Sequence, residues 1–187
     1  WSLKSFEWDN LFNYGDGNKV NFGRLTGVVG IFGKNYSGKS SIIDSLLYTI
    51  FNSTSKNERK NINVINQNRE FGRGRAEIQI GDKDYIIERS SVKYLKKLKG
   101  QETQEAKTDI EFSYYDHVMQ EEVELNGDTR NATDKNIRKM FGTVEDFLLT
   151  SMASQVDSLS FINEGSTKRK EILGKFLDLE IFDKKFK

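Results

Sequence analysis

The pattern of apolar and polar residues predicts strands at the start of the chain and an amphipathic helix soon after them. Two short strands are expected at 3–8 and 19–22, around a loop rich in Asn, Gly and Asp. The apolar run 27–32 is typical of a buried strand, and we expect it to join the first two in one sheet. In the segment 41–51, apolar residues recur at the spacing of a helix with one face on a core, namely Ile43, Leu46, Leu47 and Ile50.

The middle of the chain is predicted to be mostly antiparallel sheet. Apolar and polar residues alternate through 76–80 and again, after a turn, through 85–89, which indicates a β-hairpin. The polar excursion at 90–107 is expected to be a solvated loop between strands. Alternation resumes at 110–114, and a further strand runs into Asn126-Gly127, a pair that favours tight turns.

The last third of the chain is predicted to be helical. A short helix is expected at 133–141, and Thr143-Val144-Glu145-Asp146 resembles the capping box that opens another. A linker at 154–165 leads to a final helix at 166–176, and the charged end 180–187 fits a helix as well.

The segment between the apolar run and the first helix carries the strongest chemical signal. Residues 33–40 read Gly-Lys-Asn-Tyr-Ser-Gly-Lys-Ser, which fills every fixed position of the P-loop pattern G-x-x-x-x-G-K-[ST]. Glycines let the backbone wrap a phosphate with N–H groups pointing inward, and the following helix adds the positive end of its dipole. We therefore predict an ATP site, whose nucleotide-binding residues are Gly33, Lys34, Asn35, Tyr36, Ser37, Gly38, Lys39, Ser40 and Ser41.

Two side chains of this loop have expected roles. Lys39 would reach the β- and γ-phosphates as a point charge. The hydroxyl of Ser40 would bind Mg²⁺.

The composition of the chain excludes several kinds of site and bears on its partners and location. The formal net charge of +1 neither predicts nor excludes a nucleic-acid partner. The absence of cysteine excludes disulfides and cysteine-based metal sites, and the single histidine, His117, is predicted to be a strand residue and not a catalyst. The sequence shows no apolar run of transmembrane length and no signal peptide. We expect no membrane partner, and a location in the cytoplasm of a bacterial or phage-infected cell or in a eukaryotic nucleus.

A second acidic motif is expected in a P-loop ATPase, as an apolar strand ending in Asp or Asp-Glu that binds Mg²⁺ and positions the attacking water. The sequence contains no such strand, because Leu177-Asp178-Leu179-Glu180 lacks the apolar run and lies in charged, helical sequence. The chain therefore carries half of a nucleotide site. Either a further segment supplies the rest, or the protein is not a hydrolase.

The chain resembles the N-terminal ATPase lobe of the SMC-like DNA double-strand-break repair ATPases of the SbcC type, a version of which is a recombination endonuclease subunit in tailed phages. In that family the loop commonly reads G-x-N-G-S-G-K-S-S, so Asn35 and Ser41 match as well as the generic positions. A β-rich insertion after the P-loop helix is a second likeness. A third is Ser154-Gln155-Val156-Asp157, which resembles the Gln-loop of the family. The helix that follows resembles the one leading into its coiled coil, at Glu164, Arg169, Ile172, Leu173, Leu177, Leu179, Phe182 and Lys185.

The resemblance implies an α/β P-loop NTPase fold. Residues 1–187 would be the N-terminal lobe of an ABC-type ATPase head, with a β-rich antiparallel subdomain at about 70–128. The C-terminal helices would form the Q-loop region at about 130–187, and the coiled coil would start at the end of that region. It also implies that Gln155 reaches Mg²⁺ and the attacking water near the γ-phosphate. Lys39 and Gln155 would then be the catalytic residues of this chain, and Ser40 and Gln155 its ligands to the metal ion.

The same resemblance implies several partners. The C-terminal lobe of the same protein would return with the signature motif and the acidic strand. Two heads would sandwich two ATP molecules, closing when ATP binds and opening after hydrolysis. Such a dimer would control access to double-stranded DNA ends for a nuclease subunit of the SbcD, metallophosphoesterase type.

The chain departs from the family pattern at two places. Tyr36 stands where glycine is common, and would need either a permissive backbone angle or a stacking role near the nucleotide. Family members often carry an arginine just after the first strand, where residues 10–14 read Asn-Leu-Phe-Asn-Tyr.

Basic residues outside the loop are weaker candidates for binding phosphate or DNA. Lys93, Lys96, Lys97 and Lys99 cluster beside Tyr94, but such runs are usually solvated surface, which is the interpretation we favour. The secondary candidates are Arg73, Arg75, Lys56, Arg59 and Lys60.

Two rival functions use the same loop. A structural SMC or RecN-like DNA tether would have the same ATPase without a nuclease. A small-molecule kinase would complete its site in one compact chain with lid arginines soon after the loop, and the long β insertion and late Gln segment argue against it.

Overall fold

The computed structural model describes residues 1–55, 61–98, 101–150 and 165–176. The chain divides into two compact units, Trp1–Val144 and Glu145–Lys187, and each is described by itself.

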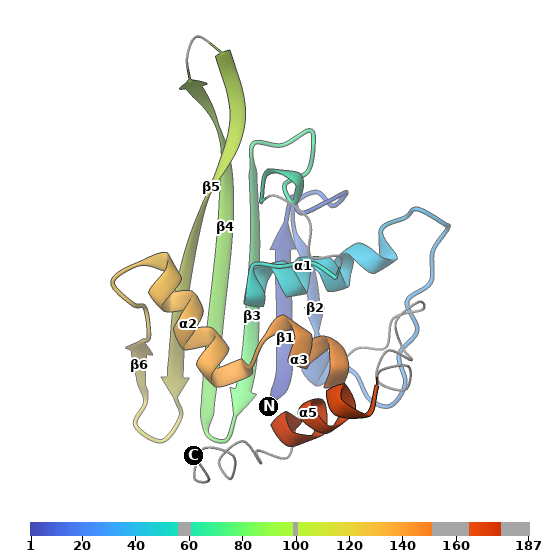
Figure 1. The fold of residues 1–187 in the computed structure, drawn as a ribbon, viewed down its shortest axis with the longest axis vertical. Helices are drawn as coiled ribbons and strands as arrows, with labels where there is room; N and C mark the ends of the chain where they lie inside the picture. Colours follow the sequence, from blue (N-terminus) through green and yellow to red (C-terminus); the bar gives the residue numbers. More distant parts are fainter. Residues whose placement is uncertain (56–60, 99–100, 151–164, 177–187) are drawn as a thin grey trace. The chain divides into compact units, whose positions relative to one another are not determined.

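The first unit is built on a six-stranded antiparallel sheet in the order β2-β1-β3-β4-β5-β6 (Figure 1). Its strands are β1 Ser2–Asp9, β2 Asn18–Asn21, β3 Phe71–Ile80, β4 Lys83–Leu98, β5 Gln101–Asp116 and β6 Glu121–Glu124. Two helices, α1 Lys39–Phe51 and α2 Arg130–Phe141, pack on one face of the sheet, and short 3₁₀ turns occupy η1 Phe22–Arg24 and η2 Asn61–Asn63. The predicted strands at 3–8 and 19–22 and the predicted helices at 41–51 and 133–141 are confirmed.

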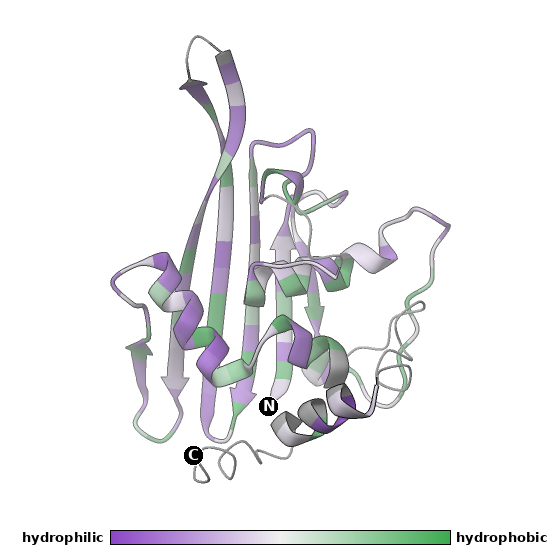
Figure 2. Cartoon of the chain, in the orientation of Figure 1, coloured by the Kyte–Doolittle hydropathy of each residue, from purple (hydrophilic) through white to green (hydrophobic). Residues whose placement is uncertain are grey.

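The core lies between this face of the sheet and the two helices. Alternate residues of β1 and β3 are buried against this core, as the two-residue period of a strand requires. Figure 2 shows hydrophobic residues where α1 meets the sheet. The buried apolar side chains include Phe6, Trp8, Leu46, Leu47, Ile50, Ala76, Ile78, Ile87, Phe112, Ile137 and Phe141.

Helix α1 approaches the sheet closely at β3. A side chain added at Gly74 would collide with the hydroxyl of Thr49, which is fully buried. Glycine at this position therefore allows the helix that follows the P-loop to rest directly on the sheet.

The prediction of a strand at 27–32 is wrong. The structure places no strand there, and the side chains of Val28 and Phe32 are 104% and 94% exposed. An apolar run becomes a buried strand only if neighbouring strands supply hydrogen bonds and cover. Among the described residues, β1 pairs instead with β2 and β3, and the run is left exposed.

The prediction of a loop at 90–107 is also wrong. Strands β4 and β5 continue through it as a two-stranded ribbon, paired from Val92 with Lys107 to Leu98 with Gln101. Figure 1 shows this hairpin extending past the other strands, and Figure 2 shows that its residues are largely hydrophilic. Because both faces of the ribbon are solvated, its sequence lacks the alternation by which strands are usually detected.

Two smaller expectations need correction. Asn126-Gly127 does not form a hairpin turn, because the Asn126 side chain accepts a bond from the Phe112 N–H (2.8 Å) and the chain then enters α2. His117 lies in the turn between β5 and β6, and not in a strand. By contrast, the hairpin turn between 80 and 83 is confirmed, with Gly81 in a left-handed conformation (φ 59°).

The second unit follows from the end of the first. Helix α3 Val144–Thr150 begins where the capping-box pattern predicts it, and α5 Ser166–Phe176 matches the predicted final helix. Three predicted features lie outside the described residues, namely most of the linker at 154–165, the start of the coiled coil and the segment 180–187. No helix in the described part of the chain is both long enough and apolar enough to cross a membrane.

Candidate functional site

The P-loop bends sharply before α1 begins at Lys39. Gly38 is left-handed (φ 90°, ψ 15°) and is the N-cap of the helix. Tyr36 is also left-handed (φ 62°), with its side chain fully exposed. This backbone angle explains why glycine is common there, since a residue with a Cβ adopts it at a cost of roughly 1 kcal/mol or more.

The N-terminus of α1 has the features of an anion site. No side chain caps it, and its first turn contains no acidic residue. Free N–H groups and the positive end of the helix dipole therefore face the loop.

Lys39 lies over its own loop. Its ammonium group donates to the carbonyl oxygens of Gly33 (2.8 Å) and Lys34 (2.7 Å). A side chain added at Gly33 would meet the Ser37 hydroxyl and the stem of Lys39, so the loop is already narrow at that glycine. Glycine backbone, an uncapped helix and a nearby ammonium group form a donor set that fits the phosphates of a nucleotide.

Ser40 and Ser41 lie in the first turn of α1. Ser40 is exposed, so its hydroxyl is accessible to a metal ion. The Ser41 N–H donates to the Gly38 carbonyl (3.0 Å) and starts the helix. Gln155, the predicted partner of Ser40 at the metal ion, lies outside the described residues.

A second segment, which we call the β1–β2 loop (residues 10–17), lies against the P-loop. The hydroxyl of Tyr14 donates to the carbonyl of Gly38 (2.9 Å), and the side chain of Asn13 occupies the space that a Cβ on Gly38 would need. The sequence offered no sign of this contact, because a tyrosine and an asparagine in a polar loop match no motif.

The basic cluster of the hairpin is mostly neutralised within the hairpin. Lys96 pairs with Glu105 (3.1 Å) and Lys97 with Glu102 (2.9 Å), while the Tyr94 hydroxyl donates to Glu105 (2.9 Å). These pairs support the interpretation of the cluster as solvated surface. Lys99 lies outside the described residues.

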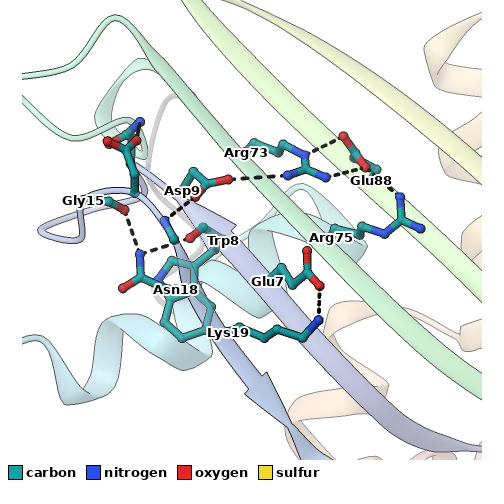
Figure 3. A network of polar contacts seen from close by, with 12 residues as sticks. Glu7, Trp8, Asp9, Gly15, Asn18, Lys19, Arg73, Arg75 and Glu88 are labelled. Carbon is teal, nitrogen blue, oxygen red and sulfur yellow. Dashed lines mark hydrogen bonds and ion pairs between the residues drawn. The ribbon is translucent and has the colours of Figure 1, made fainter.

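The arginines of β3 also have partners close by. Figure 3 shows Arg73 between Asp9 (3.4 Å) and Glu88 (2.6 Å), with Arg75 on the other side of Glu88 (3.2 Å). The Arg73 guanidinium lowers the pKa of Glu88, against the opposing effect of burial. This network joins three strands on the face of the sheet away from the helices, and it provides no free cation for phosphate. Lys56, Arg59 and Lys60 lie outside the described residues.

Arg89 is a functional candidate that sequence reasoning missed. Its guanidinium is fully buried and donates to the carbonyls of Thr49 (3.0 Å) and Ile50 (3.4 Å) in the last turn of α1. It also donates to Asp134 of α2 (2.6 Å). The P-loop helix is thus tied to α2 by a cation at its C-terminal end.

Comparison with known proteins gives the family. The AAA domain family AAA_23 matches residues 6–187, and the chain belongs to this family of SMC-like P-loop ATPase domains. The α/β fold with its antiparallel sheet agrees with this membership.

The proteins that are similar to the chain include a viral protein and a recombination protein of known structure. The uncharacterized protein R555 of Acanthamoeba polyphaga mimivirus is 28% identical over 190 residues, which is 98% of this chain and 13% of that protein. The chain thus spans about an eighth of the length of this relative. A structure of the recombination mediator protein RecF-ATPrS in the RecFOR pathway is similar at 20% identity over 56% of this chain and 26% of that chain, with a TM-score of 0.41.

Proposed function

We propose that this chain is the ATP-binding half of an ATPase head that acts in DNA repair or recombination. The observation that carries the proposal is the complete P-loop at the uncapped N-terminus of α1, in a chain of the SMC-like P-loop family. The bound species would be ATP with Mg²⁺.

Each residue of the site has a proposed role. Backbone N–H groups of Gly33 to Ser41 hold the phosphates, and the Lys39 ammonium exchanges its loop carbonyls for phosphate oxygens. Ser40 binds Mg²⁺, and Gln155 orients the attacking water, as an amide that both donates and accepts can do.

The acid that completes hydrolysis would come from another segment, which we identify with the C-terminal lobe of the same protein. The exposed apolar run 27–32 supports this proposal. It lies directly before the P-loop and has no strand partner among the described residues. Strands of the missing lobe would pair with it and cover it, so that the site and the sheet beneath it are completed together.

The assembled protein would work as a dimer of heads. ATP binding closes the dimer and hydrolysis opens it, which regulates access of a nuclease subunit to double-stranded DNA ends. A structural DNA tether remains the alternative within the same family. Co-purification of the full protein with a metallophosphoesterase-type nuclease supports the first reading, and its absence supports the tether.

The nucleotide site is tested by Lys39→Ala. Removal of the ammonium group should weaken binding of MgATP about 10- to 100-fold, the range expected for hydrogen bonds to a charged group. The dissociation constant is measured by calorimetry, with Lys135→Ala on the exposed side of α2 as the control. Equal affinity of the Lys39→Ala and unaltered chains would contradict the proposed site.

The rate of ATP hydrolysis tests whether the catalytic site is divided between this chain and a C-terminal lobe. The chain by itself should bind ATP with little turnover, and addition of the C-terminal lobe should raise the rate. Robust turnover by the chain alone would show that it needs no second lobe.

A further inference from the structure

The carbonyl group of Gly38 has two hydrogen-bond partners. One is the Ser41 N–H, which belongs to the first turn of α1 (3.0 Å). The other is the Tyr14 hydroxyl, which belongs to a loop far away in sequence (2.9 Å). Gly38 is therefore held from outside its own helix.

The β1–β2 loop that carries Tyr14 is constrained by its own hydrogen bonds. Asn10 and Phe12 have positive φ angles of 54° and 53°, which residues with a Cβ keep only when their surroundings enforce them. The Asn10 N–H donates to the Gly15 carbonyl (2.9 Å) and the Tyr14 N–H to the Leu11 carbonyl (3.0 Å). The loop is thus folded back on itself.

A third segment anchors the loop to the rest of the unit. The Phe12 N–H donates to Val64 (2.7 Å), and the Asn66 N–H donates to Asn10 (2.8 Å). The Asn66 side chain also donates to the carbonyl of Tyr14 (2.9 Å). Leu11 is fully buried and forms a bridge with Ile65. Segment 64–66 therefore fixes the β1–β2 loop in front of the P-loop.

The phenol of Tyr14 is itself oriented. Its ring lies edge-on to the buried Trp8, with the ring centroids 5.3 Å apart. Burial raises the pKa of Tyr14, so its hydroxyl stays protonated and able to donate at neutral pH.

A fixed Gly38 carbonyl has a consequence for the phosphate cradle. In a trans peptide unit the C=O and the following N–H point in opposite directions, and none of the described peptide bonds is cis. Holding the Gly38 carbonyl toward Tyr14 therefore turns the Lys39 N–H away from Tyr14, in the direction of the uncapped helix N-terminus where we propose that phosphate binds. We propose that Tyr14 is a positioning residue of the nucleotide site, which sets the direction of the Lys39 N–H donor through its hydrogen bond to Gly38. This inference rests on the proposed nucleotide binding at the P-loop.

The test is Tyr14→Phe in the full chain. The substitution keeps the ring against Trp8 and removes only the hydroxyl. Loss of one oriented donor should weaken binding about fivefold. The effect should be the same for MgATP, MgADP and magnesium tripolyphosphate, because it acts through the phosphates. Affinities are measured by calorimetry, with tripolyphosphate also measured in competition with ATP.

The matched control is Tyr48→Phe. It removes a buried hydroxyl bonded to Ser91 (2.6 Å), outside the nucleotide site. It should lower the thermal midpoint of unfolding and leave all three affinities unchanged. Tyr14→Phe behaving in the same way would show that Tyr14 is only structural, and would overturn the inference.

Two further outcomes separate the inference from the function on which it rests. Weaker binding of ATP and ADP with unchanged binding of tripolyphosphate would mean that Tyr14 contacts the nucleoside, which overturns a role through Gly38. An unaltered chain that binds no nucleotide, or binds it equally well after Lys39→Ala, would overturn the proposed function and the inference together.

Discussion

At the scale of single residues, Arg89 shows how a charge can be kept inside the protein. Burial lowers the pKa of its guanidinium, while the hydrogen bond that it donates to Asp134 raises that pKa. Its three acceptors are a carboxylate and two carbonyls in the last turn of α1, where helical carbonyls lack partners within the helix. Removal of the arginine would leave all three acceptors buried without their donor.

We predict that Arg89→Met lowers the free energy of unfolding by about 3 kcal/mol, the scale for breaking one side of a buried ion pair. Urea unfolding measures the change. Arg138→Met, on the same helix as Asp134 but exposed, should change it by less than about 0.5 kcal/mol.

The second partner gives a sharper form of this prediction. Asp134→Leu in the Arg89→Met background removes the unpaired carboxylate, so part of the lost stability should return. A double variant with the full sum of the two single losses would show that the ion pair is not the cause.

The residues of the site differ in how far the sequence could predict them. Lys39 and Ser40 belong to a fixed pattern, since phosphate binding demands those residue types at that spacing. Tyr14 and Arg89 act through contacts between segments distant in sequence, with a carbonyl as the acceptor. Any residue presents a carbonyl, so no pattern of side chains reveals such a contact.

At the scale of elements, two wrong predictions have one physical origin. The apolar run 27–32 was expected to be a strand and the polar stretch 90–107 a loop, yet only the second forms strands. Strand formation depends on pairing, and cross-strand contacts such as Lys97 with Glu102 stabilise the pairing on the ribbon without a face on the core. Elements with one face on the core, such as α1 and β3, were predicted correctly. The regular spacing of their apolar residues in the sequence matches the spacing of the residues that are buried.

The ribbon allows a prediction about DNA. Lys96 and Lys97 are already paired with glutamates, so replacing both by glutamine should leave the salt dependence of DNA binding nearly unchanged. Two lost phosphate contacts would instead reduce the slope of log affinity against log salt by about 2. Fluorescence titration of the full chain with double-stranded DNA at several salt concentrations distinguishes the two results.

At the scale of the whole molecule, the stability of the fold in acid depends on several carboxylates spread across the sheet. Burial tends to raise the pKa of Asp84, but hydrogen bonds from Lys4 (2.7 Å) and His117 outweigh it and hold that pKa below its usual range. The pKa of Glu88 is lowered chiefly by Arg73, and that of Asp116 chiefly by the backbone N–H of Met119. All three carboxylates therefore favour the folded state when ionised.

The direction of the pH dependence follows from these shifts. A group whose pKa is lowered in the folded state stabilises that state fully when the pH is above its pKa in the unfolded state, about 4. This contribution is lost as the pH falls through the pKa of the group in the folded state. We predict that the free energy of unfolding falls below about pH 5, as measured by urea unfolding from pH 3 to 7.

Glu88→Gln serves as the check on this cause. It should lower stability at neutral pH, where the charged pair with Arg73 is lost, and should make the decline in acid shallower. An unchanged acid profile in this variant would mean that other groups govern the decline.

The position of β1 in the sheet has a consequence for how the chain reaches its fold. Strands β3 to β6 follow one another through short turns, so their pairings are local and can form early. Strand β1 lies between β2 and β3, and its pairing of Leu3 with Ile78 must close a loop that contains the P-loop and all of α1. The step that inserts the first strand also brings the β1–β2 loop to the P-loop, so the hydrogen bond from Tyr14 to Gly38 is expected among the last contacts of the unit to form.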